Sequence, residues 1–180
     1  MPDVIFPLDS NKPFSDQEKI GHNRWHPEIP PVETLKPGDS FRVDCREWFD
    51  GAIKNDDSAD DVRDAPIDVV HALSGPFAVE GAEPGDLLVV DILDLGPIPQ
   101  ETGPLAGQGW GYTGIFPKNN GGSFLVDQFP DAYKAVWDFS GDTATSRHIP
   151  GVSFTGITHP GLMGTAPSAD LLASWNKREG

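Results

Sequence analysis

Short stretches in which hydrophobic and polar residues alternate predict β-strands along much of this chain. The clearest is "LKPGDSFRVDC" (35–45), in which Phe41 and Val43 alternate with Arg42 and Asp44. Successive side chains of a strand point to opposite faces, so this pattern is typical of a strand with one covered face. It follows a Pro-Gly-Asp turn, in which Pro presets the first position and Gly tolerates a positive φ.

A second Pro-Gly-Asp turn precedes a different pattern in "AEPGDLLVVDIL" (82–93). The run 87–90 is continuously apolar, which predicts a strand covered on both faces. Between these stretches, "DVVHALSGPFAVEGA" (68–82) predicts two short strands on either side of a Ser-Gly-Pro turn. "LGPIPQETGPLAGQGWGY" (95–112) has no period and predicts a long loop, a length that is usually functional in a compact domain.

Two stretches predict helices instead. "FPDAYKAVWDF" (129–139) carries an apolar stripe near the helical period, with Pro130 suited to a first turn. "SADLLASWNKREG" (168–180) has Ser168 as a candidate N-cap and basic residues toward its end, where they favour the helix dipole. The predicted class is therefore mainly β with a few short helices (α+β).

Prolines divide the beginning of the chain from the rest. "IFPLDSNKPF" and "HPEIPPVETLKPGD" interrupt any helix in this region. We expect residues 1–34 to form an extended N-terminal arm and residues 35–180 to form one β-rich domain. A chain of 180 residues is long enough for such a domain to bury a core.

Charge and composition narrow the class of partner. The formal net charge of −15 at pH 7 argues against nucleic acid, because binding phosphates requires clustered Lys and Arg. The chain has no long apolar run and no signal-peptide pattern, so we expect no membrane partner. The single cysteine, Cys45, fits a reducing compartment, and we expect a cytoplasmic protein.

The segment "KNDDSADDVRD" (54–64) concentrates five aspartates in eleven residues. It lacks the central Gly and final Glu of an EF-hand loop. A solvated acidic loop is the simplest reading. Clustered carboxylates also raise each other's pKa or collect a hard cation, so a catalytic or cation-binding role stays open.

Histidines and Cys45 give no recognised motif of their own. No pair of histidines has a metal-ligand spacing, and Pro27 breaks the helix that would give His22 and His26 one. His71, which stands in an apolar context just before "LSGP", fits a structural role in a loop as well as a catalytic one. The residues alone therefore define an acidic, β-rich domain with a loop-built pocket.

A family resemblance takes the interpretation further. It is carried, in order along the chain, by "HNRWHPEIPP", "CREWFDGAIKNDDSADDVRD", "VVHALSGPFAVEGAEPGDLL", "GYTGIFPKNNGGSFLVDQFPDAYKAVWDF" and "HIPGVSFTGITHPGLMGTAPS". These motifs resemble the formamidase branch of the acetamidase/formamidase family, from about Asp3 to Gly180. The resemblance implies that family's own β-rich fold and hydrolysis of formamide to formate and ammonia, with a small-molecule amide as partner and a homo-oligomeric assembly.

The match ends near the midpoint of the family's members. The family's second half carries a "GGN-D" stretch and a "GD-H…QGDGE" stretch, whose acidic and histidine side chains resemble metal ligands or acid–base groups. The chain therefore resembles the N-terminal half of a formamidase. Two alternatives remain open, namely a non-catalytic remnant and an acidic module that binds a cation or a small molecule.

The resemblance also suggests roles for individual residues, because amide hydrolysis needs an activated water, a stabilised oxyanion and a proton for ammonia. A divalent metal, zinc or calcium, would supply the first two. The candidates are His71, Asp61 and Asp57 for catalysis, Asn55, Trp48, Trp110 and Tyr112 for substrate binding, and Asp56 and Asp60 for a metal.

Overall fold

The structure, a computed structural model of the chain, describes residues 2–99, 106–155 and 159–179. The chain folds as two compact units. The first unit comprises Met1–Gly51, Val69–Asp91 and Gly161–Gly180, and the second comprises Ala52–Asp68 and Ile92–Pro160. Both units are thus assembled from separate stretches of sequence.

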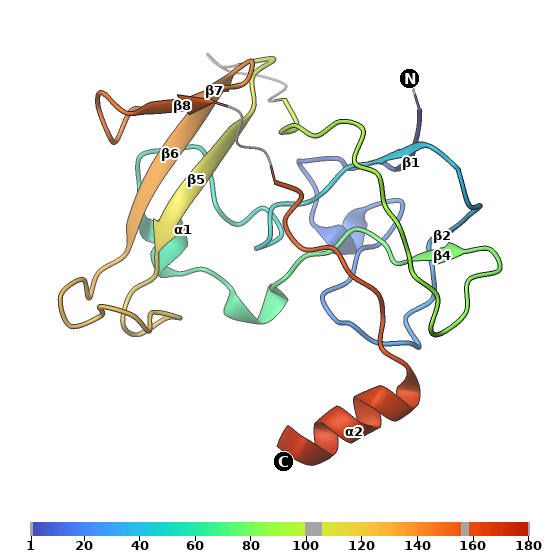
Figure 1. Cartoon of the computed structure of the whole chain (residues 1–180). Helices are drawn as coiled ribbons and strands as arrows, with labels where there is room; N and C mark the ends of the chain where they lie inside the picture. Colours follow the sequence, from blue (N-terminus) through green and yellow to red (C-terminus); the bar gives the residue numbers. More distant parts are fainter. Residues whose placement is uncertain (1, 100–105, 156–158, 180) are drawn as a thin grey trace. The chain divides into compact units, whose positions relative to one another are not determined.

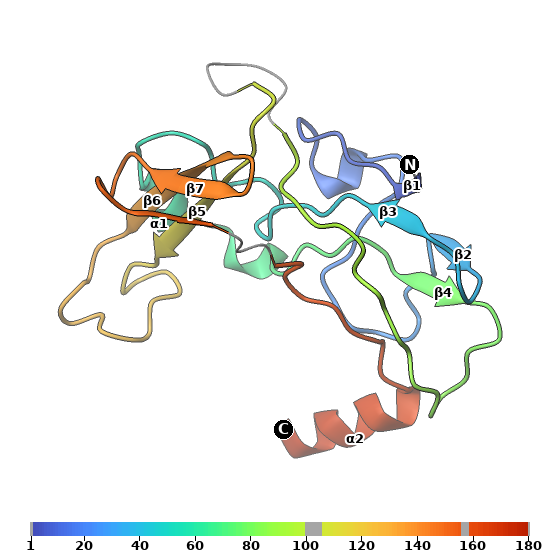
Figure 2. The same ribbon diagram turned by 45° about the horizontal axis from the view of Figure 1, so that its top comes forward.

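The first unit contains two short pairs of parallel strands (Figure 1 and Figure 2). Strand β1 (Asp3–Phe6) pairs with β3 (Phe41–Val43), and β2 (Glu33–Leu35) pairs with β4 (Phe77–Val79). The predicted strand at 41–43 and the second predicted strand of 68–82 are therefore confirmed. In place of the first strand predicted there, the chain forms a short 3-10 turn (Ile67–Val69) and one isolated bridge.

Aromatic side chains form the core of the first unit. Phe6 is fully buried, and its ring contacts those of Phe14 and Phe77 edge-on, each at 6.2 Å between centroids. Phe14 begins a short 3-10 helix (Phe14–Asp16), and Phe49 is also buried. Edge-to-face contacts of this kind add to the stabilisation that burial of aromatic surface provides.

The two Pro-Gly-Asp turns have the same geometry. In each, the aspartate carboxylate accepts a hydrogen bond of 2.8 Å from the backbone amide three residues earlier, at Asp39 and at Asp86. The glycines, Gly38 and Gly85, have φ of +88° and +104°, which a Cβ would disfavour. The turn prediction is confirmed at both sites.

The apolar run after the second turn behaves differently from its prediction. Within the described residues, no strand forms between Asp86 and Pro99, and Leu87 to Val90 are exposed. The prediction of a paired strand covered on both faces is therefore wrong for this chain. The sequence pattern is that of a buried strand, but neither a neighbouring strand nor a covering surface is present among the described residues.

A four-stranded antiparallel sheet forms the second unit (Figure 1). The strands are β5 (Trp110–Ile115), β6 (Tyr133–Ser140), β7 (Thr143–Ser146) and β8 (Ser153–Thr155), in that spatial order. The end of the predicted 95–112 loop is thus the start of β5, and residues 100–105 of that loop lie outside the described residues.

Strand β6 replaces the helix predicted at 129–139, so that prediction is wrong. In "YKAVWDFS" one set of alternate residues is Tyr133, Ala135, Trp137 and Phe139, and the other begins with Lys134. The aromatic residues satisfy a period of two as well as they satisfy the helical period. Pairing with β5 on one side and β7 on the other decides between them.

One short helix packs against this sheet. Helix α1 (Asp60–Arg63) contacts β6 and contributes Val62, which is fully buried together with Val136. Ile53, just before the acidic segment, is buried as well. Buried apolar side chains therefore lie just before the acidic segment, at Ile53, and near its end, at Val62.

The helix predicted at the end of the chain is confirmed as α2 (Ala169–Glu179). Ser168 caps it, because its Oγ accepts a hydrogen bond from the Leu171 amide at 3.2 Å. Among the described residues, no helix is long and apolar enough to span a membrane. The expected class, mainly β with a few short helices, is confirmed.

Candidate functional site

A buried lysine organises the acidic segment of the second unit. Lys134 on β6 has a side chain with no exposed surface, and its Nζ donates three hydrogen bonds. The acceptors are Oδ2 of Asp61 at 2.7 Å, Oδ1 of Asp56 at 2.9 Å and the carbonyl oxygen of Lys54 at 3.0 Å. An ammonium has three N–H donors, so all of them are satisfied. The acidic segment is therefore folded around a cation and is not a freely solvated loop.

Asp61 is the most enclosed of these carboxylates. Its Oδ2 also accepts the Lys54 amide at 2.7 Å, and its Oδ1 accepts the Val62 amide at 2.8 Å. Together with Lys134, these donors occupy both oxygens. Such an arrangement fixes the start of α1 and holds the lysine in place.

Asp56 lies on the solvent side of the same lysine. The hydrogen bond from Lys134 is the main cause that lowers the pKa of the Asp56 carboxyl, and it outweighs the opposing effect of partial burial. The Ser58 amide donates to the same oxygen at 3.1 Å. Asp56 is thus held as a carboxylate that helps to neutralise Lys134.

A second cation, Arg147, binds the neighbouring part of the segment. It follows β7, and its Nε donates to Oδ1 of Asp57 at 2.8 Å while its Nη2 donates to Oδ1 of Asn55 at 2.7 Å. Its Nη1 approaches Asp138 of β6 at 3.3 Å. The guanidinium therefore joins the loop to the sheet and fixes one oxygen of Asp57. Oδ2 of Asp57 has no hydrogen-bond partner among the described residues.

His148 completes this group of side chains. Its Nδ1 accepts a hydrogen bond from the Val136 amide at 3.1 Å, so the ring proton of the neutral form is on Nε2. Nε2 is buried and lies 3.3 Å from Oδ1 of Asp57, without the alignment of a hydrogen bond to any described atom. His148 and Arg147 thus approach the same oxygen of Asp57.

Two of the predicted binding residues share a sheet face with Lys134. In β5, Trp110 and Tyr112 lie opposite Asp138 and Val136 of β6, and directly paired residues of an antiparallel sheet project to the same face. We call this the lysine face. The two aromatic rings are 6.3 Å apart between centroids. The structure therefore places aromatic surface on the same side of the sheet as the charged cluster.

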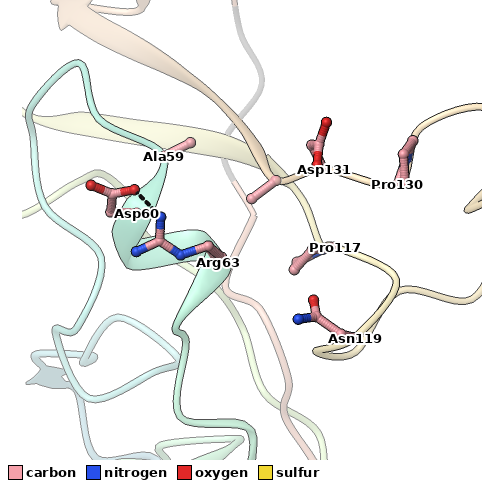
Figure 3. A pocket seen from close by; sticks show the side chains of 8 residues that line it. Ala59, Asp60, Arg63, Pro117, Asn119, Pro130 and Asp131 are labelled. Atoms are coloured by element: carbon pink, nitrogen blue, oxygen red, sulfur yellow. Dashed lines mark hydrogen bonds and ion pairs between the residues drawn. The ribbon is translucent and has the colours of Figure 1, made fainter.

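A hollow of about 300 Å³ adjoins α1 (Figure 3). Arg63 extends along it and pairs with Asp60, while Pro117, Asn119 and Asp131 lie across from it. Arg63 also pairs with Asp64, and this contact raises the pKa of the guanidinium and lowers that of the Asp64 carboxyl. The lining is mixed: charged and polar side chains alternate with alanines and prolines, the residues being Ala59, Asp60, Arg63, Pro117, Asn119, Pro130, Asp131 and Ala132.

The remaining predicted site residues belong to the first unit. The rings of Trp48 and His71 are 4.9 Å apart between centroids, and the Ala72 amide donates to the Trp48 carbonyl at 3.0 Å. His71 therefore lies beside the Trp48 ring, with the two ring planes tilted by 43°, and the sequence allows it either a structural or a catalytic role.

The predicted metal ligands do not form a metal site as they stand. Lys134 binds Asp56 and Arg63 binds Asp60, so each carboxylate is already neutralised by a side chain of the protein. Among the described residues, no three His, Cys, Asp or Glu side chains group as metal ligands. Asp56 and Asp60, as they are paired here, do not fit a zinc or calcium ion. The divalent metal that the family resemblance implies remains a prediction.

Three residues of the cluster were missed by sequence reasoning, namely Lys134, Arg147 and His148. Lys134 was hidden in the wrongly predicted helix, although strand alternation in "YKAVWDFS" would have placed it opposite the aromatic residues. Arg147 and His148 lie far along the sequence from their partner Asp57. Arg147 and Asp57 are 90 residues apart. A spacing motif carries no signal over such a distance.

Comparison with known proteins identifies the family. The sequence model of the Acetamidase/Formamidase family matches residues 7–180. The chain is 65% identical over 99% of its length to a protein named acetamidase from Mycolicibacterium smegmatis, and 54% identical over 98% to one named formamidase from Methylophilus methylotrophus. It spans 44% and 42% of the lengths of these relatives.

Solved structures agree with this result. The fold matches a gamma lactamase from Delftia acidovorans with a TM-score of 0.89 and 50% identity, over 98% of this chain and 41% of that one. An acetamidase from Bacillus halodurans matches with a TM-score of 0.59 and 21% identity, over 75% of this chain and 40% of that one, which supports the fold alone. The fold is that of an amidase class of proteins. The chain belongs to the Acetamidase/Formamidase family.

Proposed function

We propose that this chain forms one wall of an active site that hydrolyses the C–N bond of a short linear amide. Family membership and the names of its relatives support this reaction class. The observation that carries it is the oriented carboxylate of Asp57, which Arg147 binds and the buried Nε2 atom of His148 approaches. An amide hydrolase needs such a base, whose position is fixed before the substrate arrives.

Asp57 is the residue that we propose as general base. One of its oxygens is anchored by Arg147, and the other has no partner among the described residues. A carboxylate held in this way accepts a proton from water without first reorienting. Nε2 of His148 is buried and Nδ1 already accepts the Val136 amide, so we assign His148 a positioning role toward Asp57.

The other predicted residues take supporting roles in this proposal. Asn55 carries a side-chain amide suited to hydrogen-bond a carbonyl oxygen, and Arg147 holds it beside Asp57. Trp110 and Tyr112 would limit the size of the acyl group from the lysine face. Because both oxygens of Asp61 accept hydrogen bonds, we propose that it positions Lys134 and α1.

We further propose formamide as the substrate, giving formate and ammonia. Formamide differs from acetamide by one methyl group, and a pocket discriminates a group of that size by about 10–200-fold. Names of the relatives support both amides, since one is called acetamidase and another formamidase. His71 and Trp48 of the first unit remain proposed as a proton donor and a substrate contact.

Ammonia release from formamide and from acetamide tests the proposal. We would assay the 180-residue chain and a chimera in which it is fused to the part of the Mycolicibacterium smegmatis acetamidase that lies outside the match. Asp57→Asn is expected to lower kcat/KM at least about 100-fold in whichever form is active, because a general base contributes that much or more.

Asp127→Asn is the matched control. Asp57 and Asp127 have side chains that are 77% and 78% exposed, and each pairs with one cation, Arg147 or Lys118. The control should keep full activity. Equal activity of the two variants would contradict the role of Asp57. Folded proteins that release no ammonia from either amide would contradict the proposed function and favour a non-catalytic or cation-binding module.

A further inference from the structure

The segment Leu87–Leu93 is an extended apolar stretch with two distinct faces. Exposure alternates along it, as expected of extended backbone: the values are 88% for Leu87, 49% for Leu88, 71% for Val89, 49% for Val90, 53% for Ile92 and 75% for Leu93. The odd-numbered positions form an almost bare face, and the even-numbered positions form a half-covered one. Such a regular pattern indicates a strand that has one face partly packed and lacks its other contacts.

The backbone of this segment is unpaired as well. Among the described residues, the peptide groups of 87–93 join no sheet and make no hydrogen bond to another backbone. Figure 1 draws the segment as a long trace without an arrow after β4 (Phe77–Val79). A row of free N–H and C=O groups beside apolar side chains is a ready template for strand addition.

An apolar strand without cover is unusual for a natural protein surface. Soluble proteins blunt exposed edges with charges, prolines or bulges, and six of the seven residues here are apolar. The sequence pattern by itself predicts a strand covered on both faces. The pattern and the observed exposure agree if a further surface covers this segment.

The length of the relatives points to a source for such a covering surface. The chain matches over 98–99% of its own length but spans only 41–44% of the acetamidase, the formamidase and the solved gamma lactamase. The rest of each relative is therefore the part of the family fold that these residues do not include. We propose that Leu87–Leu93 is a docking strand that pairs with a strand from that remaining part of the family fold.

Charge disfavours a second copy of this chain as the occupant. Asp86 and Asp94 flank the segment, and Asp91 lies within it. Antiparallel pairing of two copies about Val90 would place Asp86 of each copy opposite Asp94 of the other. Like charges directly opposite each other destabilise a strand pair.

Hydrogen exchange measured on two proteins tests the proposal. One is the 180-residue chain, and the other is its chimera with the part of the Mycolicibacterium smegmatis acetamidase outside the match. The amides of 87–93 are expected to exchange rapidly in the chain alone and at least about 100-fold more slowly in the chimera, since a paired strand opens only with the structure around it.

Substitutions on the bare face give a second readout. Leu87→Asp with Val89→Asp is expected to abolish the protection in the chimera and to leave the melting temperature of the chain alone unchanged. Ile20→Asp is the matched control, because Ile20 is a similarly exposed apolar residue of the first unit, outside the segment. This control should affect neither protein.

Several outcomes would overturn the proposal. Rapid exchange of 87–93 in both proteins would show that nothing covers the segment. Slow exchange in the chain alone, together with a dimer mass, would identify a second copy as the occupant. A chimera that stays insoluble while the chain alone is soluble would mean that the two parts are not complementary. None of these results depends on whether either protein hydrolyses an amide.

Discussion

The two units satisfy their side chains in opposite ways. In the second unit, even a lysine with no exposed surface has a hydrogen-bond acceptor for each of its N–H groups, from Asp61, Asp56 and a backbone carbonyl. In the first unit, a small aromatic core around Phe6 coexists with the bare apolar face of Leu87 and Val89. The second unit therefore satisfies the charge of Lys134 internally, whereas the first leaves the apolar surface of Leu87 and Val89 uncovered.

This difference shows that a region can bury a charge with all of its partners, while another region of the same chain leaves apolar side chains without a covering surface. Burying a charge requires its partners to be present, so the Lys134 cluster reports a finished local structure. Exposing apolar surface costs free energy roughly in proportion to area and does not prevent folding, so an incomplete region can persist. The four predictions below test this contrast, beginning with the largest expected effect.

Removal of the buried ammonium should destabilise the second unit most. Lys134→Met is expected to lower the free energy of unfolding by about 3–5 kcal/mol, because it leaves Asp61 enclosed without its cation. Urea denaturation of the purified chain measures the loss. The double variant Lys134→Met with Asp61→Asn should recover part of it, and a double variant no more stable than Lys134→Met would contradict this explanation.

One substitution at two positions tests the first unit. Leu35→Ala is expected to cost about 3 kcal/mol, since Leu35 is 8% exposed and its truncation leaves a cavity. Leu87→Ala changes the same side chain at a bare position and should stay within about 0.5 kcal/mol of wild type. Thermal or urea unfolding of both variants gives the comparison. Equal costs would mean that Leu87 is covered in solution.

Removal of the N-cap of α2 should have a smaller effect on stability. A substitution inside the same helix serves as a control with an expected effect of opposite sign. Ser168→Ala removes the acceptor for the Leu171 amide and should cost the helix about 1 kcal/mol. Ser174 lies in the interior of the same helix. Ser174→Ala should raise the stability of the helix by about 0.5 kcal/mol, because alanine has a better helix propensity than serine. Circular dichroism at 222 nm follows both. Loss of helicity in both variants would contradict the capping role.

The pH dependence of Asp56 should be the smallest effect. Its pKa is lowered in the folded state, chiefly by the hydrogen bond from Lys134. The stabilisation is therefore fully present above the unfolded pKa of about 3.9 and is lost as the pH falls through the folded value. Since Asp56 is more than half exposed, the contribution should be below about 1 kcal/mol.

Unfolding of wild type and Asp56→Asn at several pH values between 6 and 2.5 measures this contribution. The difference between the two proteins should shrink toward low pH. A difference that stays constant over the whole range would show that the charge of Asp56 is not its cause. Added salt should also reduce the difference, because exposed charges are screened.

Much of the fold was accessible from local patterns, and the failures have a physical cause. The β-rich class, both Pro-Gly-Asp turns and α2 follow from chemistry within a few residues. The stretch 133–139 was misread because its aromatic residues fit both periods, and only pairing with β5 and β7 selects the strand. The run 87–90 has the pattern of a buried strand, yet no pattern specifies the surface that would cover it.

The candidate site was accessible only in part. The aspartates of 54–64 stood out by density, and the family resemblance raised their importance. Their cations, Lys134 and Arg147, come from β6 and from the end of β7, far along the sequence. Charge density shows that carboxylates need partners, but only the folded sheet shows which cations supply them.

The interleaving of the two units has a consequence for how this chain is made and cut. The chain crosses between the units at residues 51/52, 68/69, 91/92 and 160/161. A ribosome therefore releases the last residues of the second unit, up to Pro160, before the α2 segment that ends the first unit. No single protease cut at a crossing therefore yields the two units as separate fragments.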